Sequence, residues 1–449
     1  MISVPDTVVD AGVQAAREAE ANAPWNFTVN LLDILLITLG FSLISRETVM
    51  PVLVSTLTDS KLAVGLVAAI FGFGFYLPQL LTAGYTEQLR YKKPFVMTVS
   101  LVGERLPYLL IALAVWGLAA RAPALTLVLF YLCLATAAFS AGAATPAWLD
   151  IIAKVIPVRR RGLWSGLGHS LGALLGVVGA LLAGRILAGY PYPTNYALLF
   201  GLASVFIFLS WVGLALNREP PSVVTKEAIP LRVYFRQLPA VLRRNLNYRA
   251  YLLSRMTVLL GAMANGFFIV YGRERFGIDA AGIGALTALL VGSVAVMNLV
   301  WGFLADRWGH KLVLAGGALL LALAGLNAWL APSAAWLGLT FVLLGAYSAA
   351  DMVSSLTIIL EFCAPEDRPT YIGLTNTLLA PILILAPVLG GWLATVAGYT
   401  PLLITSTTIA AIGGLLLVFW VHEPRTAPLV VVSSAEPSLF TPSSLETDL

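Results

Sequence analysis

Twelve long apolar stretches dominate this sequence and limit the folds that it can adopt. A helix needs about 20 mostly apolar residues to cross a bilayer, and every stretch reaches that length. The stretches lie at about residues 28–56, 63–88, 94–119, 123–149, 163–189, 195–216, 249–272, 281–305, 311–332, 335–360, 369–398 and 401–421. The sequence lacks the period-two alternation of a membrane β-barrel. We therefore predict an all-α membrane protein with twelve transmembrane helices.

The composition excludes several other classes of protein. Of the 449 residues, 59% are hydrophobic and 11% are charged, whereas a soluble protein has about 25% charged residues. Much of the surface must therefore face lipid. Two cysteines, far apart in the sequence, do not indicate a disulfide framework. We expect the lipid bilayer and a small-molecule substrate as partners, no nucleic acid, no metal and no cofactor, and a monomeric protein.

The 27 basic residues are divided unevenly between the two sides of the predicted helices. Nineteen fall on the side of the N-terminus, five fall on the other side, and Arg46, Arg105 and Arg255 lie within spans. Cytoplasmic loops carry an excess of Lys and Arg. The distribution thus predicts a multi-pass protein of the plasma (inner) membrane with both termini in the cytoplasm.

The longest connection divides the spans six and six. We predict a polar cytoplasmic tail (1–27), a six-helix bundle (28–216), a cytoplasmic linker with an amphipathic basic helix (217–248), a second six-helix bundle (249–421) and a disordered cytoplasmic tail (422–449). An internal repeat supports this division, because GYTEQLRYKK at 84–93 aligns without a gap on GFLADRWGHK at 302–311. Transporters built from two such halves hold their substrate between them, near the midplane.

The segment GFLADRWGHK resembles the loop motif of the major facilitator superfamily: a Gly, a variable residue, Leu, Ala, Asp, Arg, a variable residue, Gly and then basic residues. With the twelve spans and the basic central loop, the resemblance covers about residues 28–421 and implies two pseudo-symmetric six-helix bundles. It also implies that Asp306 stabilises the outward-facing state as part of a conformational latch. The latch residues are Gly302, Asp306, Arg307, Gly309 and Lys311.

The copy of this motif in the first half is degenerate. Gln88 stands where the motif has Asp, and Tyr91 stands where it has the second Gly, although Glu87 is adjacent. The corresponding residues of the degenerate latch are Gly84, Glu87, Arg90 and Lys93.

Ionisable residues inside spans are the first candidates for function, because a charge at the bilayer centre is costly. Asp351, about 15 Å from the cytoplasmic end of its span, is the main candidate for a substrate or proton site. The resemblance implies that the first, fourth, seventh and tenth spans line a central cavity, so Arg46 and Glu47 are also candidates. Adjacent residues of a helix point about 100° apart, so these two should not face the same way. Asn265 and Asn376 add uncharged groups, and a purely structural role for each residue stays open.

Other charges in the spans are interpreted as structural or gate pairs. Glu104 and Arg105 belong to the third span, where an ion pair would brace the N-terminal half. Arg255 lies close to the inner end of the seventh span, and we expect its side chain to extend towards the inner interface.

Two carboxylates, Asp150 and Glu361, occupy equivalent inner ends of the fourth and tenth spans. Together with Arg368, they are candidates for an inner gate that pairs each half with the opposite one.

These features favour a secondary active transporter that works by rocking of two halves and is coupled to protons. No phosphate-binding loop of the GxxxxGK[ST] kind is present in the sequence. A polytopic membrane enzyme such as a lipid-linked transferase is the alternative from another class, but such enzymes generally need a sizeable loop with clustered carboxylates or His. A transporter-like sensor or scaffold stays open, as does the choice between drug efflux and uptake of a sugar-like nutrient.

Overall fold

A computed structural model of the chain describes residues 6–222, 242–243, 245–363 and 368–425. Twelve helices among these residues are long and apolar enough to cross a membrane, and the described residues form no strand. The prediction of an all-α protein with twelve membrane-spanning helices is confirmed. Most of the predicted linker helix and the tail from residue 426 lie outside the described residues.

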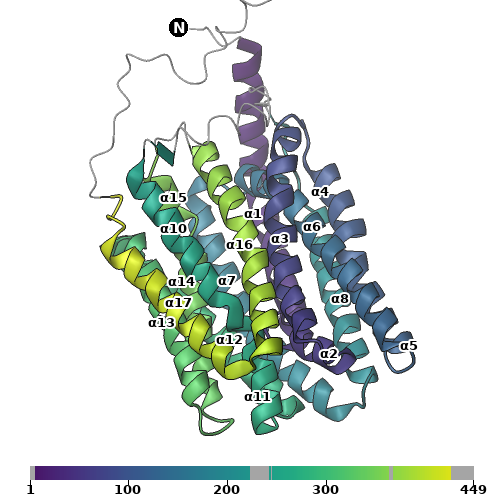
Figure 1. The fold of residues 1–449 in the computed structure, drawn as a ribbon. Coiled ribbons are helices and arrows are strands. Elements are labelled where there is room, and N and C mark those ends of the chain that lie inside the picture. The colour runs from purple at the N-terminus through teal and green to yellow at the C-terminus, as the bar shows by residue number, and fades with distance from the viewer. Residues whose placement is uncertain (1–5, 223–241, 244, 364–367, 426–449) are drawn as a thin grey trace, which may run out of the picture.

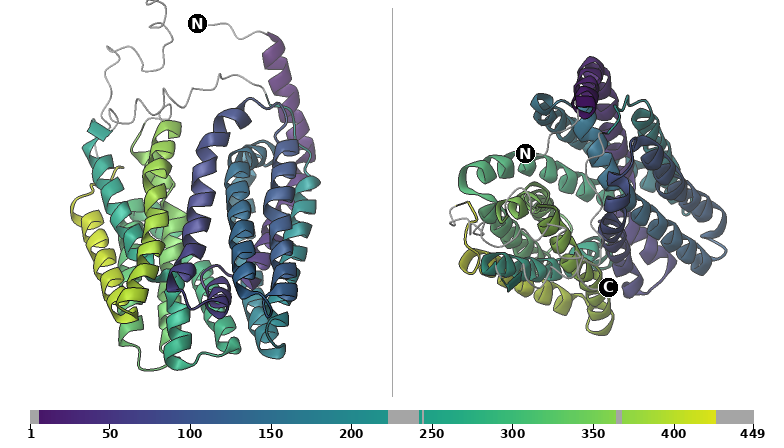
Figure 2. Two further views of the ribbon diagram at one scale, coloured as in Figure 1. Left: turned by 45° about the vertical axis from the view of Figure 1, so that its right-hand side comes forward. Right: turned by 90° about the horizontal axis from the view of Figure 1, so that it is seen from above.

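The first six spans form one half of the molecule and the last six form the other (Figure 1; Figure 2). The N-terminal half contains α1 (Asp6–Leu43), α2 (Val49–Leu57), α3 (Lys61–Glu87), α4 (Lys93–Val99), η1 (Ser100–Arg105), α5 (Leu106–Leu118), α6 (Pro123–Val155), α7 (Val158–Gly189) and α8 (Thr194–Ala215). The C-terminal half contains α10 (Leu246–Gly261), η2 (Ala262–Phe267), α11 (Phe268–Phe276), α12 (Ala280–Trp308), α13 (His310–Leu330), α14 (Leu337–Ser354), α15 (Thr357–Glu361), α16 (Arg368–Val396) and α17 (Tyr399–Phe419).

Local sequence signals set the ends of several helices. The side chains of Ser60, Asn245 and Asp279 each accept a hydrogen bond from a backbone N–H in the first turn of α3, α10 and α12. These bonds satisfy donors that a helix leaves free at its start. Gly309 and Gly398 have φ angles of 91° and 85°, which residues with a side chain rarely adopt. They separate α12 from α13 and α16 from α17.

Several spans are interrupted rather than continuous. The first stops at Leu43 and resumes at Val49, whereas the sequence predicted one uninterrupted span at 28–56. The polar run at 45–48 falls in the gap, and Pro51 lies in the first turn of α2, where its missing N–H costs nothing. The third span contains the π-helical turn η1, and the seventh contains the 3₁₀ segment η2. Such irregular turns often occur at functional positions.

The two halves pack along two pairs of helices, α3 with α16 and α7 with α12. Glycines allow the close approach. A Cβ atom on Gly65 would lie 2.2 Å from the carbonyl oxygen of Pro387, and one on Gly284 would lie 2.5 Å from the Cα atom of Gly184. A larger residue at either position would therefore push the halves apart.

Two polar contacts join the halves near one end of the molecule. Most basic residues of the sequence fall at the end of the molecule where α3 stops and α4 begins, and we call it the basic end. We call the other end of the molecule the opposite end. Near the opposite end, the hydroxyl oxygens of Thr48 and Thr287 are 2.7 Å apart. The ammonium group of Lys61 lies 4.1 Å from the ring centre of Tyr399. Both contacts join the two halves.

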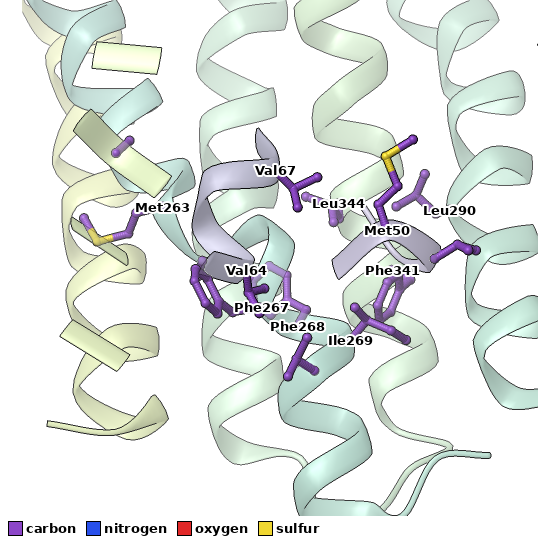
Figure 3. Close-up of a cluster of buried hydrophobic side chains, with 14 of the residues drawn as sticks. Met50, Val64, Val67, Met263, Phe267, Phe268, Ile269, Leu290, Phe341 and Leu344 are labelled. Atoms are coloured by element: carbon purple, nitrogen blue, oxygen red, sulfur yellow. The ribbon is translucent and has the colours of Figure 1, made fainter. Parts of the chain in front are cut away.

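A shared apolar cluster closes the opposite end (Figure 3). Side chains from α2 and α3 of the first half pack among side chains from η2, α11, α12 and α14 of the second half. The labelled members are Met50, Val64, Val67, Met263, Phe267, Phe268, Ile269, Leu290, Phe341 and Leu344. All of them are buried. The structure is thus closed at the opposite end.

Candidate functional site

The main charged pair within the spans joins Asp351 of α14 to Arg255 of α10. The Arg255 guanidinium donates a hydrogen bond to Oδ1 of Asp351. The side chain of Arg255 is 4% exposed and that of Asp351 is 31% exposed. The Tyr251 hydroxyl accepts a hydrogen bond from Arg255, and the Tyr347 hydroxyl interacts with Arg255 electrostatically. The carboxylate is therefore the more accessible member of a largely buried pair.

The direction of the Arg255 side chain differs from the one that the sequence predicted. Instead of extending towards the basic end, it donates a hydrogen bond to Asp351 of α14. A buried cation gains more from a partner carboxylate than from a partial exit to the interface, and Asp351 supplies that carboxylate.

The N-terminal half faces this pair with Tyr76 of α3 and Arg46. The Tyr76 hydroxyl interacts electrostatically with Asp351, Arg46 and Arg255, and with Tyr347. We call these five residues the central cluster. Its members come from both halves, so a relative movement of the halves must change their spacing.

Arg46 and Glu47 lie in the gap between α1 and α2 and bind each other, with 2.7 Å between Nε and Oε1. The expected divergence of the two side chains is wrong, because the residues are not part of a regular helix. The guanidinium also lies 4.5 Å from the ring centre of Phe71, an arrangement that stabilises a cation beside an aromatic face.

The two asparagine candidates lie on neighbouring elements of the C-terminal half. Asn265 belongs to η2, which packs on α16 and α3. Its Oδ1 atom is buried and accepts no hydrogen bond from the described residues. Asn376 is half-buried on α16. Neither contacts the central cluster through a hydrogen bond within the described part of the chain.

Glu104 and Arg105 form a buried ion pair with each other in η1. Close to them, Asp33 of α1 accepts a hydrogen bond of 2.5 Å from the Ser210 hydroxyl of α8. The sequence analysis missed Asp33, although a carboxylate inside the run LLDILLITLG was a visible signal.

The predicted latch loop lies at the basic end, between α12 and α13. Asp306 is exposed, and Arg307 lies 5.6 Å from the ring centre of Trp308. The Lys311 ammonium donates to the carbonyl oxygen of Val418. A Cβ added to Gly302 would have no atom of the described residues within 4 Å, so that face of α12 is open in this state.

A carboxylate that the sequence analysis missed, Glu423, packs against this loop. The carbon of its carboxyl group lies only 2.4 Å from the position that a Cβ of Gly309 would take, and the carboxylate accepts the backbone N–H of Lys311. Burial and the nearby Glu361 carboxylate raise the pKa of Glu423. Arg425 donates to Glu361 and to the carbonyl oxygen of Ala305. The first residues of the predicted C-terminal tail therefore contact the C-terminal half.

The degenerate loop of the first half also packs against a carboxylate, in this case that of Glu219. Glu219 accepts backbone N–H bonds from Lys92 at 3.0 Å and Lys93 at 2.9 Å, and a bond from the Lys154 ammonium at 2.8 Å. Its side chain is 2% exposed, whereas Glu87 is exposed. The signal for Glu219 and Glu423 was a Glu-Pro pair four residues after the last helix of each half.

The remaining members of the degenerate loop also bond within the first half. The Lys93 ammonium donates to the carbonyl oxygen of Asn217, and the carbonyl of Arg90 accepts the N–H of Ser222. Gly84 is half-buried near the end of α3.

The proposed inner-gate carboxylates also pair within their own halves. Asp150 lies 3.0 Å from the Lys92 ammonium and 2.9 Å from that of Lys154. Glu361 pairs with Arg425 of its own half. Arg368 begins α16, and its side chain lies outside the described part of the chain. In this state the described charges at the basic end hold each half together rather than joining the two.

Twelve spans in two halves, closed together at one end and meeting at a charged central cluster, define a polytopic membrane transporter. The chain belongs to the Major Facilitator Superfamily, whose family model matches residues 35–273 and 251–445. This match confirms the family that the loop motif suggested.

Solved structures share the fold at low sequence identity. A D-xylose-proton symporter is 14% identical, with a TM-score of 0.67 over 90% of this chain and 99% of that one. A variant of the nucleoside transporter NupG is 12% identical, with a TM-score of 0.66 over 87% of this chain and 99% of that one. Among curated proteins, a multi-drug resistance efflux pump PmrA homolog of Lactococcus lactis subsp. lactis (strain IL1403) is 30% identical over 140 residues. That match spans 31% of this chain and 33% of the relative.

Proposed function

We propose that the protein moves a small organic solute across the membrane by alternating access, with the Asp351–Arg255 pair as its binding site. The single observation that carries this proposal is a largely buried ion pair of the C-terminal half that faces Tyr76 and Arg46 of the other half. A charge inside a membrane protein is retained only where it has a partner or a task. The pair lies where residues of both halves can contact one ligand.

The cluster also suggests the kind of solute. It contributes two guanidinium groups, one carboxylate and two tyrosine hydroxyls, with Phe71 beside Arg46. Such a site can bind a molecule that has a charged or polar group and an apolar or aromatic body. The partial relative named as a multi-drug efflux pump favours export over uptake of a nutrient.

We further propose that the basic end faces the cytoplasm, that the protein resides in the plasma membrane, and that the structure represents the inward-facing state. The closed apolar cluster at the opposite end supports this assignment. The open face at Gly302 and the exposed Asp306 support it as well. The latch is expected to form in the outward-facing state, and in this structure Asp306 is not buried in such a contact.

Proton coupling through Asp351 completes the proposal. A proton on Asp351 would neutralise the carboxylate and free Arg255 for an anionic or polar group of the solute. Solute and proton binding would then be linked at one site, as population-shift models require.

The test begins with a thermal-shift screen of amphipathic cations, nucleosides, sugars and organic acids on the purified full chain. Compounds that stabilise the protein are then used for flux measurements in proteoliposomes, with and without a pH gradient. A charge-assisted hydrogen bond contributes about 1.5–3 kcal/mol, so Asp351→Asn should lower flux at limiting solute about tenfold or more. The matched control is Asp59→Asn, which alters an exposed carboxylate between α2 and α3.

Two results would overturn parts of the proposal. Flux that is independent of the gradient and unchanged in Asp351→Asn would remove both the binding site and the proton coupling. Binding without any flux would favour a sensor over a transporter.

A further inference from the structure

A second group of charges is buried in the N-terminal half, away from the solute site. Asp33 of α1 is 5% exposed, and its carboxylate accepts a hydrogen bond of 2.5 Å from the Ser210 hydroxyl of α8. Trp148 of α6 approaches the same carboxylate as a donor. Neither of these neighbours carries a charge, so neither balances that of Asp33.

The charges with the largest effect on Asp33 come from the adjacent pair in η1. Arg105 acts on it with opposite sign and Glu104 with the same sign. The Arg105 guanidinium, however, already bonds to Glu104. We call Asp33, Glu104 and Arg105, with Ser210 and Trp148, the lateral cluster.

The other helix that packs on α1 does not supply a balancing charge. α7 contacts the neighbouring face of α1, where Gly168 lies against Ile34 and Gly172 against Thr38. His169 on α7 is exposed and bonds to Ser165. Among the described residues, one guanidinium therefore serves two carboxylates in a buried site, which leaves one negative charge in excess.

We propose that the lateral cluster binds one proton, shared between Asp33 and Glu104, at a site separate from the central cluster. A buried carboxylate without a cation is neutralised more easily than it is kept charged. Asp33, Glu104 and Ser210 together offer five side-chain oxygen atoms, one of which already binds Arg105, and this is fewer than the six or more ligands that a hard cation takes. The ligand assigned to this site is therefore the proton.

A buried tyrosine connects the lateral cluster to the central cluster. Tyr108 of α5 is 1% exposed, and its hydroxyl interacts electrostatically with Glu104 and Arg105 of the lateral cluster and with Arg46 of the central cluster. Loss or gain of the proton would thus change the field at Arg46. This link rests on the proposed transport function, whereas the proton site itself does not.

The proton can be detected by infrared spectroscopy of the full chain in lipid, because a protonated carboxylic acid has a carbonyl band that a carboxylate lacks. At about pH 7 we expect such a band in the natural protein. Removal of either carboxylate leaves one anion for one cation, so the band should disappear both in Asp33→Asn and in Glu104→Gln. Arg105→Gln leaves two anions without a cation, and the band should grow. Asp59→Asn is the matched control and should leave it unchanged.

Several outcomes would overturn the proposal. The first is the absence of the band in the natural protein, and the second is its persistence in both carboxylate variants. The third is loss of the band when sodium replaces N-methylglucamine in the buffer, because the site would then bind sodium. If Asp33→Asn does not fold, Ser210→Ala takes its place, since loss of that hydrogen bond should shift the band and an unshifted band would contradict the role of Asp33. The band should survive in Asp351→Asn, so failure of the solute site and failure of the proton site give different results.

Discussion

Single residues at the basic end show how each half of the transporter is held together. Glu219 follows α8, and Glu423 follows α17, each by four residues. Both return to the start of the third span of their own half, where each accepts a backbone N–H, from Lys93 and Lys311 respectively. A carboxylate at a helix N-terminus satisfies free donors and interacts favourably with the helix dipole. In both halves, therefore, a glutamate after the last helix binds the start of the third span, although the loop motif itself is intact in only one of them.

Glu219→Gln should lower stability because it removes the charge of a buried carboxylate that binds two backbone N–H groups and the Lys154 ammonium. We expect a loss of about 1–3 kcal/mol, measured by thermal or denaturant unfolding in detergent. Glu87→Gln, an exposed carboxylate at the same end, should change stability by less than about 0.5 kcal/mol. Equal effects of the two substitutions would contradict the role given to Glu219.

The two glycines of the latch loop should respond differently to alanine. Gly309 has a φ angle of 91°, and a Cβ there would lie 2.4 Å from the Glu423 carboxyl carbon, so Gly309→Ala should cost at least about 1–2 kcal/mol. Gly302 has free space around it, and Gly302→Ala should be neutral or stabilise the helix by up to about 1 kcal/mol. Unfolding measurements in detergent compare the two, and a cost at Gly302 as large as at Gly309 would refute this interpretation.

The sequence was enough to choose several candidate residues, but it did not predict which residues they contact. The position of a carboxylate deep inside an apolar run made Asp351 a candidate site residue without any structure. The partner, Arg255, was assigned the wrong direction, because a single sequence does not say which helix packs beside which. Asp33 was missed for a related reason: its significance comes from Glu104 and Arg105, which lie far away in sequence and meet it only in the folded bundle.

At the scale of elements, the interface between the halves is built from smooth helix faces. α7 meets α12 where Gly184 faces Gly284, so the two backbones approach each other without intervening side chains. Small residues allow such approach in membrane proteins, where packing rather than exclusion of water drives association.

Gly284→Val should act as a wedge at this contact. Because any Cβ at Gly284 would lie within 3 Å of the Gly184 backbone, the opposite end should close less often and the population should shift towards the state open there. Spin-label distances across the opposite end report the shift. Gly292→Ala on the same helix is the control, since its Cβ would meet Val177 at an ordinary 3.7 Å. An unchanged distance distribution in Gly284→Val would contradict the importance of this contact.

The apolar runs predicted all twelve spans but not the interruptions within them. Hydropathy averages over about 20 residues, so four polar residues at 45–48 disappear within the run at 28–56. The π-helical turn η1 and the 3₁₀ segment η2 also lie inside apolar runs and were not predicted. Several candidate residues lie in these interruptions: Arg46, Glu47, Glu104, Arg105 and Asn265. The parts of the spans that were hardest to predict from the sequence therefore contain many of the candidate site residues.

At the scale of the whole molecule, the apolar cluster and the Thr48–Thr287 contact close the opposite end, and the proposed alternating-access cycle requires a second state in which that end is open. A covalent bond across that end would prevent the other state from forming.

Thr48→Cys combined with Thr287→Cys provides such a bond. The hydroxyl oxygens, whose positions the two sulfur atoms would take, are 2.7 Å apart, so the two side chains point towards each other, as a disulfide requires. Oxidation should abolish solute flux, and reduction should restore it. Each single variant, in which Cys133 and Cys363 are still present, should be insensitive to oxidation. Full flux in the oxidised double variant would show that the opposite end does not need to open.

The carboxylate at the end of each half has a further consequence for how such a protein can change over evolutionary time. Since Glu219 and Glu423 bind within their own halves, the proposed alternating-access cycle needs to break only contacts between the halves and can leave these internal bonds intact. The residues that govern resistance to unfolding are then different from those that govern turnover. Selection can adjust the speed of the cycle through interface glycines and threonines while the folding free energy of each half stays nearly constant.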